Sequence, residues 1–195
     1  MFAMLNYFAK IRLYLLQLVD KLWYTGTGKH YERMVDMSIV ENGIGKVDSV
    51  KFAAYLQKKA LDSGKSVNVT KIQKWLYICY GLYFALYQEP LLNERPKAWE
   101  YGPVLPRVYS RYKKKGLQSD FSSEDLDILS QYDYIIKATL DAAGDLSASK
   151  LVGWTHGEGK AWDKTVRLEG KYAPMDNHDI YLDFKRFVNS DGQQE

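Results

Sequence analysis

The sequence is poor in the residues that build disulfide or metal frameworks. It contains a single cysteine, Cys79, and three histidines that lie far apart, at His30, His156 and His178. A lone cysteine cannot form an internal disulfide and is typical of a protein in a reducing cytosol, so we expect a cytoplasmic location. Because a chain of 195 residues can bury a sizeable core unaided, neither a metal nor another cofactor is expected.

Long uncharged apolar runs and catalytic motifs are also missing. Charged residues interrupt the most apolar stretch, 1–24, so no segment of about 18 residues is fit to span a membrane. There is no GxSxG, no CxxC and no phosphate-binding glycine loop. Cys79 falls inside an aromatic stretch, which favours a buried and inert thiol. The sequence therefore predicts a protein that is not an enzyme.

The strongest cluster of acid and base groups is His156, Glu158 and Asp163, in and just after a glycine-rich turn. Such side chains often satisfy backbone hydrogen bonds within a turn, which is the interpretation we favour. The alternative is a hydrolase or nucleotide-acting enzyme that uses His156 and Glu158 for proton transfer.

Positive charge is concentrated in one segment, although the net charge is only +3. Residues 101–118 contain no acidic residue and five basic ones, namely Arg107, Arg111, Lys113, Lys114 and Lys115. Residues 120–145 then carry seven acidic residues and one lysine. The basic segment suits contact with phosphates, which leaves a DNA-binding regulator as an alternative. The acidic neighbour makes nucleic acid the less favoured partner, and electrostatic steering of a charged protein is an equally simple use.

Apolar residues at helical spacing predict a mainly α protein. Residues 70–87 are hydrophobic on nearly all sides, which is typical of a helix in the middle of a fold, and Thr70 is its expected N-cap. Further helices are expected at 47–65, with Asp48 or Ser49 as N-cap and Gly64 at the end, at 106–115 with Pro106 in the first turn, and at 122–144 after a serine cap. Two more are expected after caps at Ser147 or Ser149 and at Asn177 or Asp179. The stretch Ala98–Tyr101, closed by a Gly102-Pro103 turn, predicts at most a small β element near Trp99. We expect a single compact helical domain around the central aromatic helix.

Residues 1–45 are predicted to form an amphipathic helix and a glycine-rich linker, which precede the domain at 46–195. Within 1–24, the apolar stripe consists of Phe8, Ile11, Leu15, Leu18 and Leu22. The favoured interpretation is a helix that docks on its own domain or on a second subunit. A partner-binding helix and a membrane-surface helix are the alternatives. Met34 and Met37 lie just upstream of the domain, so a start of translation at either one is a further hypothesis.

Three motifs within the domain resemble the Panacea family. They are KIQKWLY at 71–77, AWEYGPV at 98–104 followed by Pro106, Val108 and Tyr109, and a Thr155-His156 turn that leads to Trp162. The first two motifs are specific when they occur together. The resemblance extends over residues 47–190.

The resemblance implies a cytosolic SocA-like antitoxin, of a kind often associated with phage. Such proteins neutralise a cognate protein toxin by direct binding without catalysis, and a SocA-like member delivers its toxin to a protease. A toxin is therefore the expected partner, while a protease and a homo-oligomer stay open. Aromatic and arginine side chains dominate protein interfaces, so the expected partner-binding residues are Trp99, Tyr101, Tyr109, Arg111 and Tyr112.

If translation starts at Met34 or Met37, the cellular protein should lack the predicted amphipathic helix. Mass spectrometry of the endogenous protein should then find no peptide from the segment 5–22. Detection of such a peptide would refute the later start.

Overall fold

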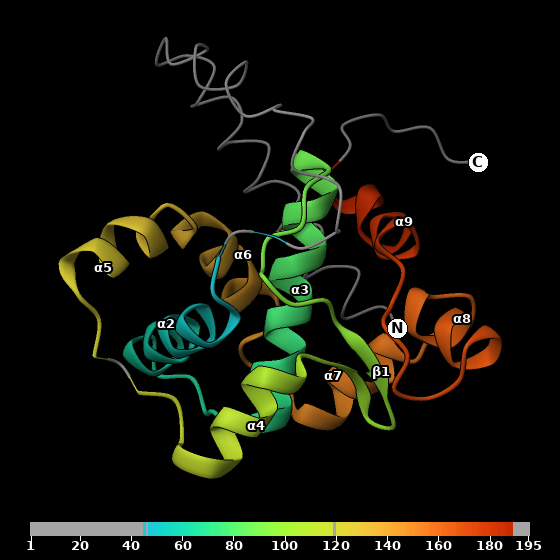
Figure 1. Cartoon of the computed structure of the whole chain (residues 1–195), viewed down its shortest axis with the longest axis horizontal. Helices are drawn as coiled ribbons and strands as arrows, with labels where there is room; N and C mark the ends of the chain where they lie inside the picture. Colours follow the sequence, from blue (N-terminus) through green and yellow to red (C-terminus); the bar gives the residue numbers. More distant parts are fainter. Residues whose placement is uncertain (1–44, 46, 119, 189–195) are drawn as a thin grey trace, which may run out of the picture.

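A computed structural model describes residues 45, 47–118 and 120–188 of the chain, which form eight helices and one two-stranded sheet. The helix α3 (Val69–Tyr87) stands at the centre, as Figure 1 shows, with the other elements arranged around it. The predicted mainly α fold around a central aromatic helix, with one small β element near Trp99, is confirmed. The predicted amphipathic helix lies outside the described residues, as does all of the linker except Gly45.

The core forms around α3 because other elements cover this helix on nearly all sides. Every residue of α3 from Lys71 to Tyr83 is buried, and Trp75 and Tyr80 are among the largest side chains with no exposed surface. The helix α9 (Asn177–Val188) packs closely against α3, with Phe184 against Gly81. Burial of apolar surface contributes about 25 cal/mol per Å², so the buried side chains of α3 contribute to the stability of the fold.

The helix α2 (Ser49–Asp62) confirms the expected caps at both ends. Asp48 accepts hydrogen bonds from the backbone of Val50 and Lys51, which satisfies N–H groups that a helix start leaves free. At the other end Gly64 adopts a left-handed conformation with φ 70°. The predicted cap of α3 was wrong: Asn68, not Thr70, accepts from Lys71 N.

The predicted single helix at 122–144 is two helices, α5 (Ser123–Ser130) and α6 (Asp133–Ala143). The side chains of Ser130 and Gln131 both donate to the carbonyl of Asp127, which competes with continuation of the helix. The bend turns Tyr132 inward, where its ring packs edge-on against Phe52 and Tyr83. Ser122 starts α5 with the expected cap.

In the second half of the chain, Ser147 caps α7 (Ala148–Thr155) as expected. The helix α8 (Ala161–Leu168) was not predicted, because its N-cap residue Lys160 makes no side-chain capping bond and gives no sequence signal. The cap of α9 is Asp176, which accepts from the backbone of residues 178 and 179, rather than Asn177 or Asp179. No helix in the described part of the chain combines the length and apolar character needed to cross a bilayer.

The small sheet consists of β1 (Lys97–Trp99) and β2 (Gly102–Val104), paired antiparallel with Ala98 opposite Pro103. The turn is formed by residues 100 and 101, so the expectation of a turn at Gly102-Pro103 was wrong. The segment 172–175 runs along the outer edge of β1, where Tyr172 N donates to Ala98 O at 2.8 Å. The helix α4 (Pro106–Lys115) follows at once, with proline in its first turn as predicted.

Contact between α3 and α9 depends on the absence of a side chain at Gly81. A Cβ there would lie 2.3 Å from the ring of Phe184, so Gly81→Ala should lower the free energy of unfolding by about 1–3 kcal/mol through overpacking. Gly153, exposed on α7 with open space around it, is the matched control. Gly153→Ala should raise the free energy of unfolding by about 0.5–1 kcal/mol. Denaturant titration measures both, and a stabilising Gly81→Ala would contradict the packing.

Candidate partner-binding surface

Two polar side chains of α3 hold the hairpin against the core. The side-chain amide of Gln73 accepts from Leu105 N at 2.7 Å and donates to Leu105 O at 3.4 Å. The ammonium of Lys74 donates to Pro103 O at 2.9 Å. Both side chains are buried. Because buried backbone groups need partners, Gln73 and Lys74 fix where β2 and the start of α4 lie.

Two further residues of the same segment hold the end of α6. Lys71 Nζ donates to Gly144 O at 2.9 Å, and Trp75 Nε1 donates to Ala143 O at 3.1 Å. These carbonyls belong to the last turn of a helix, where no intrahelical donor is available. The motif 71–75 therefore joins the core helix to α6 on one side and to the hairpin on the other.

The third motif also reaches the hairpin. Trp162 Nε1 donates to Trp99 O at 2.8 Å, and the His156 ring stacks on Trp162 with centroids 3.7 Å apart. Gly102 has φ 93°, and a Cβ on it would lie 2.5 Å from Thr155 Oγ1. A left-handed residue in such a close approach has to be glycine. All three sequence motifs thus meet at β1 and β2.

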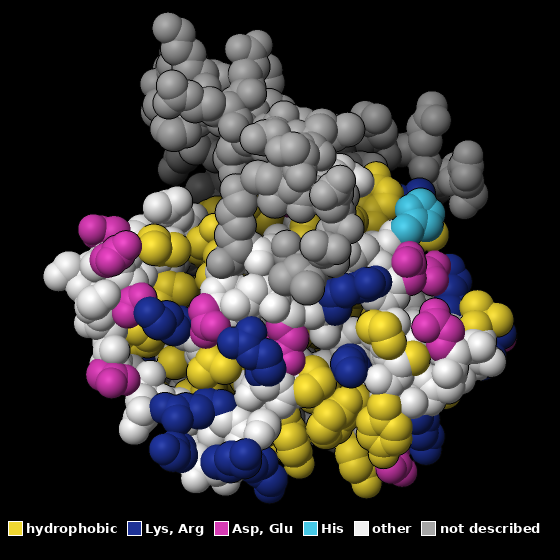
Figure 2. Space-filling model, viewed as in Figure 1, with side chains coloured by type: hydrophobic (Ala, Val, Ile, Leu, Met, Phe, Trp, Pro, Cys, Tyr) yellow, Lys and Arg dark blue, Asp and Glu magenta, His cyan; other side chains and the backbone are white. Residues whose placement is uncertain are grey.

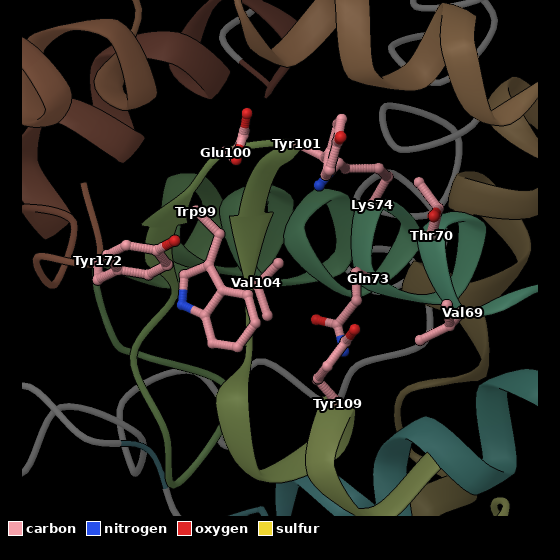
Figure 3. A pocket seen from close by; sticks show the side chains of 10 residues that line it. All are labelled: Val69, Thr70, Gln73, Lys74, Trp99, Glu100, Tyr101, Val104, Tyr109 and Tyr172. Carbon is pink, nitrogen blue, oxygen red and sulfur yellow. The ribbon is translucent and has the colours of Figure 1, made fainter. Parts of the chain in front are cut away.

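A pocket of about 250 Å³ opens between the hairpin, α3 and α4. In Figure 3 the side chains of Trp99 and Tyr172 form one flank, while Gln73 and Lys74 come from α3 on the facing flank. The lining side chains are Val69, Thr70, Gln73, Lys74, Trp99, Glu100, Tyr101, Val104, Tyr109 and Tyr172. We call this feature the aromatic pocket.

The rings of the aromatic pocket come from three separate segments of the chain. Trp99 on β1 contacts Tyr109 on α4 and Tyr172 in the loop before α9, with ring centroids 5.2 and 5.7 Å apart. Tyr101, at the tip of the hairpin, is 70% exposed. Tyr172 has φ 73°, a strained conformation for a residue with a side chain. The hydrogen bond from Tyr172 N to Ala98 O stabilises this conformation.

Burial changes the ionisation of two groups beneath the hairpin. Loss of solvent lowers the pKa of Lys74 to about 7, from an ordinary value of 10.5. Burial, and next the nearby positive charge of Lys74, lower the pKa of His156. Among the described residues no carboxylate forms an ion pair with Lys74, whose hydrogen bond goes to the Pro103 carbonyl.

A basic groove lies beside the aromatic pocket. It is lined by Val50, Pro106, Arg107, Ser110, Arg111, Lys114 and Lys115. Figure 2 shows hydrophobic side chains gathered over the hairpin and Lys and Arg side chains next to them over α4. Asp48 forms an ion pair with Arg107 at 2.9 Å, and Arg111 donates to Gln118.

The structure brings together three of the five expected partner-binding residues: Trp99, Tyr101 and Tyr109 line the aromatic pocket. Arg111 lies in the adjacent basic groove. Tyr112 is half-buried against the core, so it offers less surface to a partner.

The sequence did not point to Lys74, Glu100 or Tyr172 as part of this surface. Lys74 belongs to the motif on the core helix. Nothing in the local sequence indicates that its ammonium contacts Pro103 in the hairpin, 29 residues further along the chain. The only signal for Tyr172 was its aromatic character in a loop.

The contacts of the candidate acid and base groups are those of a structural turn. His156 stacks on Trp162, Glu158 is exposed, and Asp163 accepts from the backbone of Gly159 and forms an ion pair with Arg167. In the part of the chain that the structure describes, no three His, Cys, Asp or Glu side chains are placed to hold a metal ion.

Cys79 is fully buried, with its sulfur 3.2 Å from Thr139 Oγ1, and burial raises its pKa to about 12. The expected burial of the thiol is confirmed, and since the thiolate is the reactive form of cysteine, this environment disfavours its reaction.

Comparison with known proteins gives one consistent result. Residues 72–163 match the family described as Antitoxin SocA-like, Panacea domain. The chain is also 30% identical over 130 residues to Antitoxin SocA of Caulobacter vibrioides (strain NA1000 / CB15N), an alignment that covers 60% of this chain and 69% of that protein. No solved structure matches the chain.

The burial of Lys74 should be visible in the pH dependence of stability. Between the folded pKa of about 7 and the ordinary value of 10.5, the unfolded chain holds a proton at Lys74 that the folded chain has released. Stability therefore rises with pH in this window, by up to about 1.4 kcal/mol per pH unit. Urea unfolding of the wild type and Lys74→Met should diverge between pH 7.5 and 9.5 and run parallel below pH 6. Parallel curves throughout would contradict the shift.

Proposed function

The chain belongs to the SocA-like antitoxin family of Panacea-domain proteins, and from this membership we propose that it neutralises a cognate protein toxin by direct binding. The toxin is a protein of the same cell, and neutralisation requires no chemistry on it. Delivery of the bound toxin to a protease is a further step that we propose as compatible with this role. The site of action is the cytoplasm, which suits a chain whose one cysteine, Cys79, is a free thiol.

The binding surface is the aromatic pocket together with the adjacent basic groove. The observation that carries this proposal is the exposure of large aromatic side chains around a pocket: Tyr101 is 70% exposed and Tyr172 is 56% exposed, with Trp99 between α4 and the loop. Tyrosine, tryptophan and arginine are enriched among the residues that dominate protein interfaces.

The scaffold beneath this surface favours a binding role. The hairpin is held by buried hydrogen bonds from Gln73, Lys74 and Trp162, so the aromatic side chains are presented by backbone that is fixed before the partner arrives. Such preorganisation reduces the entropy lost on association. The basic groove adds long-range attraction for an acidic partner.

Co-expression with the adjacent reading frame tests the proposal. If that frame encodes the toxin, it should arrest growth alone and be tolerated together with the wild-type chain. Tyr101→Ala should weaken protection, because truncation of a central interface aromatic costs about 2 kcal/mol or more, roughly 30-fold in affinity. Ile128→Ala, which removes an exposed apolar side chain on α5 at the other side of the molecule, should protect fully.

Two outcomes would count against the proposal. A neighbour that is harmless when expressed alone would reject the antitoxin role for this pair. Equal protection by the wild type and Tyr101→Ala at limiting antitoxin levels would place the toxin on another surface.

A further inference from the structure

We propose that the aromatic pocket takes up the side chain of a glutamate or aspartate of the bound toxin, and that Lys74 at its inner wall is the group that pairs with the carboxylate. This inference rests on the proposed function and assigns the chemistry of the contact. It makes Lys74 a specificity-determining residue rather than only a support for the hairpin.

The size and position of the aromatic pocket suit a single side chain of a partner. A cavity of about 250 Å³ is smaller than the pockets that hold drug-sized ligands, and suits one side chain of a partner. Lys74 lines it from α3, and Figure 3 shows its side chain running toward the hairpin with the nitrogen beside Tyr101. The surrounding rings cover the aliphatic part of an inserted side chain, and the Thr70 and Tyr109 side chains add hydroxyl groups that can donate to a carboxylate.

The charge of Lys74 favours an acidic group in the pocket. Lys74 is only 1% exposed, and its ammonium has one acceptor among the described residues, the Pro103 carbonyl. A buried cation normally has an anionic partner. The one acidic residue that lines the pocket, Glu100, is exposed in the hairpin turn and forms no ion pair with Lys74. In its protonated form, Lys74 of the free chain therefore has a carbonyl acceptor but no anionic partner among the described residues, and a carboxylate of another molecule can supply one.

Positive charge next to the pocket also favours an acidic partner. The basic groove on α4 contributes Arg111, Lys114 and Lys115 next to the pocket, while Arg107 in the same groove is paired with Asp48. These charges attract an acidic segment of a partner toward the opening and disfavour a basic one. Aromatic walls then exclude water from the pair, which strengthens the attraction.

Proton linkage gives this contact a signature that a merely structural lysine lacks. Burial holds the pKa of Lys74 near 7 in the free chain, and a carboxylate beside it raises that pKa, so binding takes up a proton. The other titratable groups around Lys74 are His156 at the end of α7, Glu100 and Tyr101 in the turn, Tyr109 on α4 and Tyr172 in the loop before α9. Lys74→Met separates the contribution of Lys74 from theirs.

The test is calorimetric titration of the full chain with the purified product of the adjacent reading frame, between pH 6 and 9.5. Wild-type affinity should fall by up to tenfold per pH unit above about pH 7.5. Lys74→Met should bind roughly 30-fold more weakly at pH 6.5 and lose this slope. Lys58→Met, which removes an exposed lysine on α2 that is paired with Asp62, should keep both affinity and slope.

A second measurement does not depend on how well Lys74→Met folds. Acidic residues of the toxin are replaced one at a time by their amides and titrated against the wild-type chain. One replacement should both weaken binding and abolish the pH slope. If no replacement does so, or if wild-type binding does not change with pH, the inference is overturned while the antitoxin role stands. If the wild-type chain does not bind the toxin at all, the proposed function falls and the inference falls with it.

Discussion

The structure depends on the hydrogen bonds that buried polar residues of α3 make to backbone carbonyls of other elements. Lys71 and Trp75 bind the last turn of α6, while Gln73 and Lys74 bind the hairpin. A buried polar group without a partner costs about 1–3 kcal/mol, so each of these side chains strongly favours one relative placement of two elements. An entirely apolar helix would bury more surface but would not specify where the hairpin lies.

This constraint links the fold to the proposed binding surface. Three motifs that are separate in the sequence meet at β1 and β2, because Lys74 and Thr155 approach Gly102 and Trp162 donates to Trp99 O. The aromatic side chains above them are therefore presented from backbone that is held by the core. The same geometry leaves a lysine ammonium at the wall of a pocket with a single carbonyl acceptor among the described residues.

Much of the fold could be predicted from the sequence, because apolar spacing and caps report local structure directly. The core helix at 70–87 and the basic helix after Pro106 were predicted within a residue or two. The bend before Tyr132 was not predicted, since it combines local bonds to the Asp127 carbonyl with tertiary packing of Tyr132 against Phe52 and Tyr83, and the packing has no signal in the local sequence. The helix α8 starts without a side-chain cap and left no signal.

The candidate surface was predicted only in part, because some of its residues are close in sequence and others meet only in the tertiary fold. Trp99, Tyr101 and Tyr109 are close in sequence and share a pocket, so a reading of one segment could find them. Lys74 and Tyr172 come from distant segments that only the tertiary fold brings to the hairpin.

The proposal that the toxin binds at the aromatic pocket and the basic groove is tested most directly by hydrogen–deuterium exchange of the free chain and of its complex with the toxin. The account predicts that added protection is concentrated in residues 99–115 and around Tyr172. Protection confined to α5, α6 or α9 would contradict it.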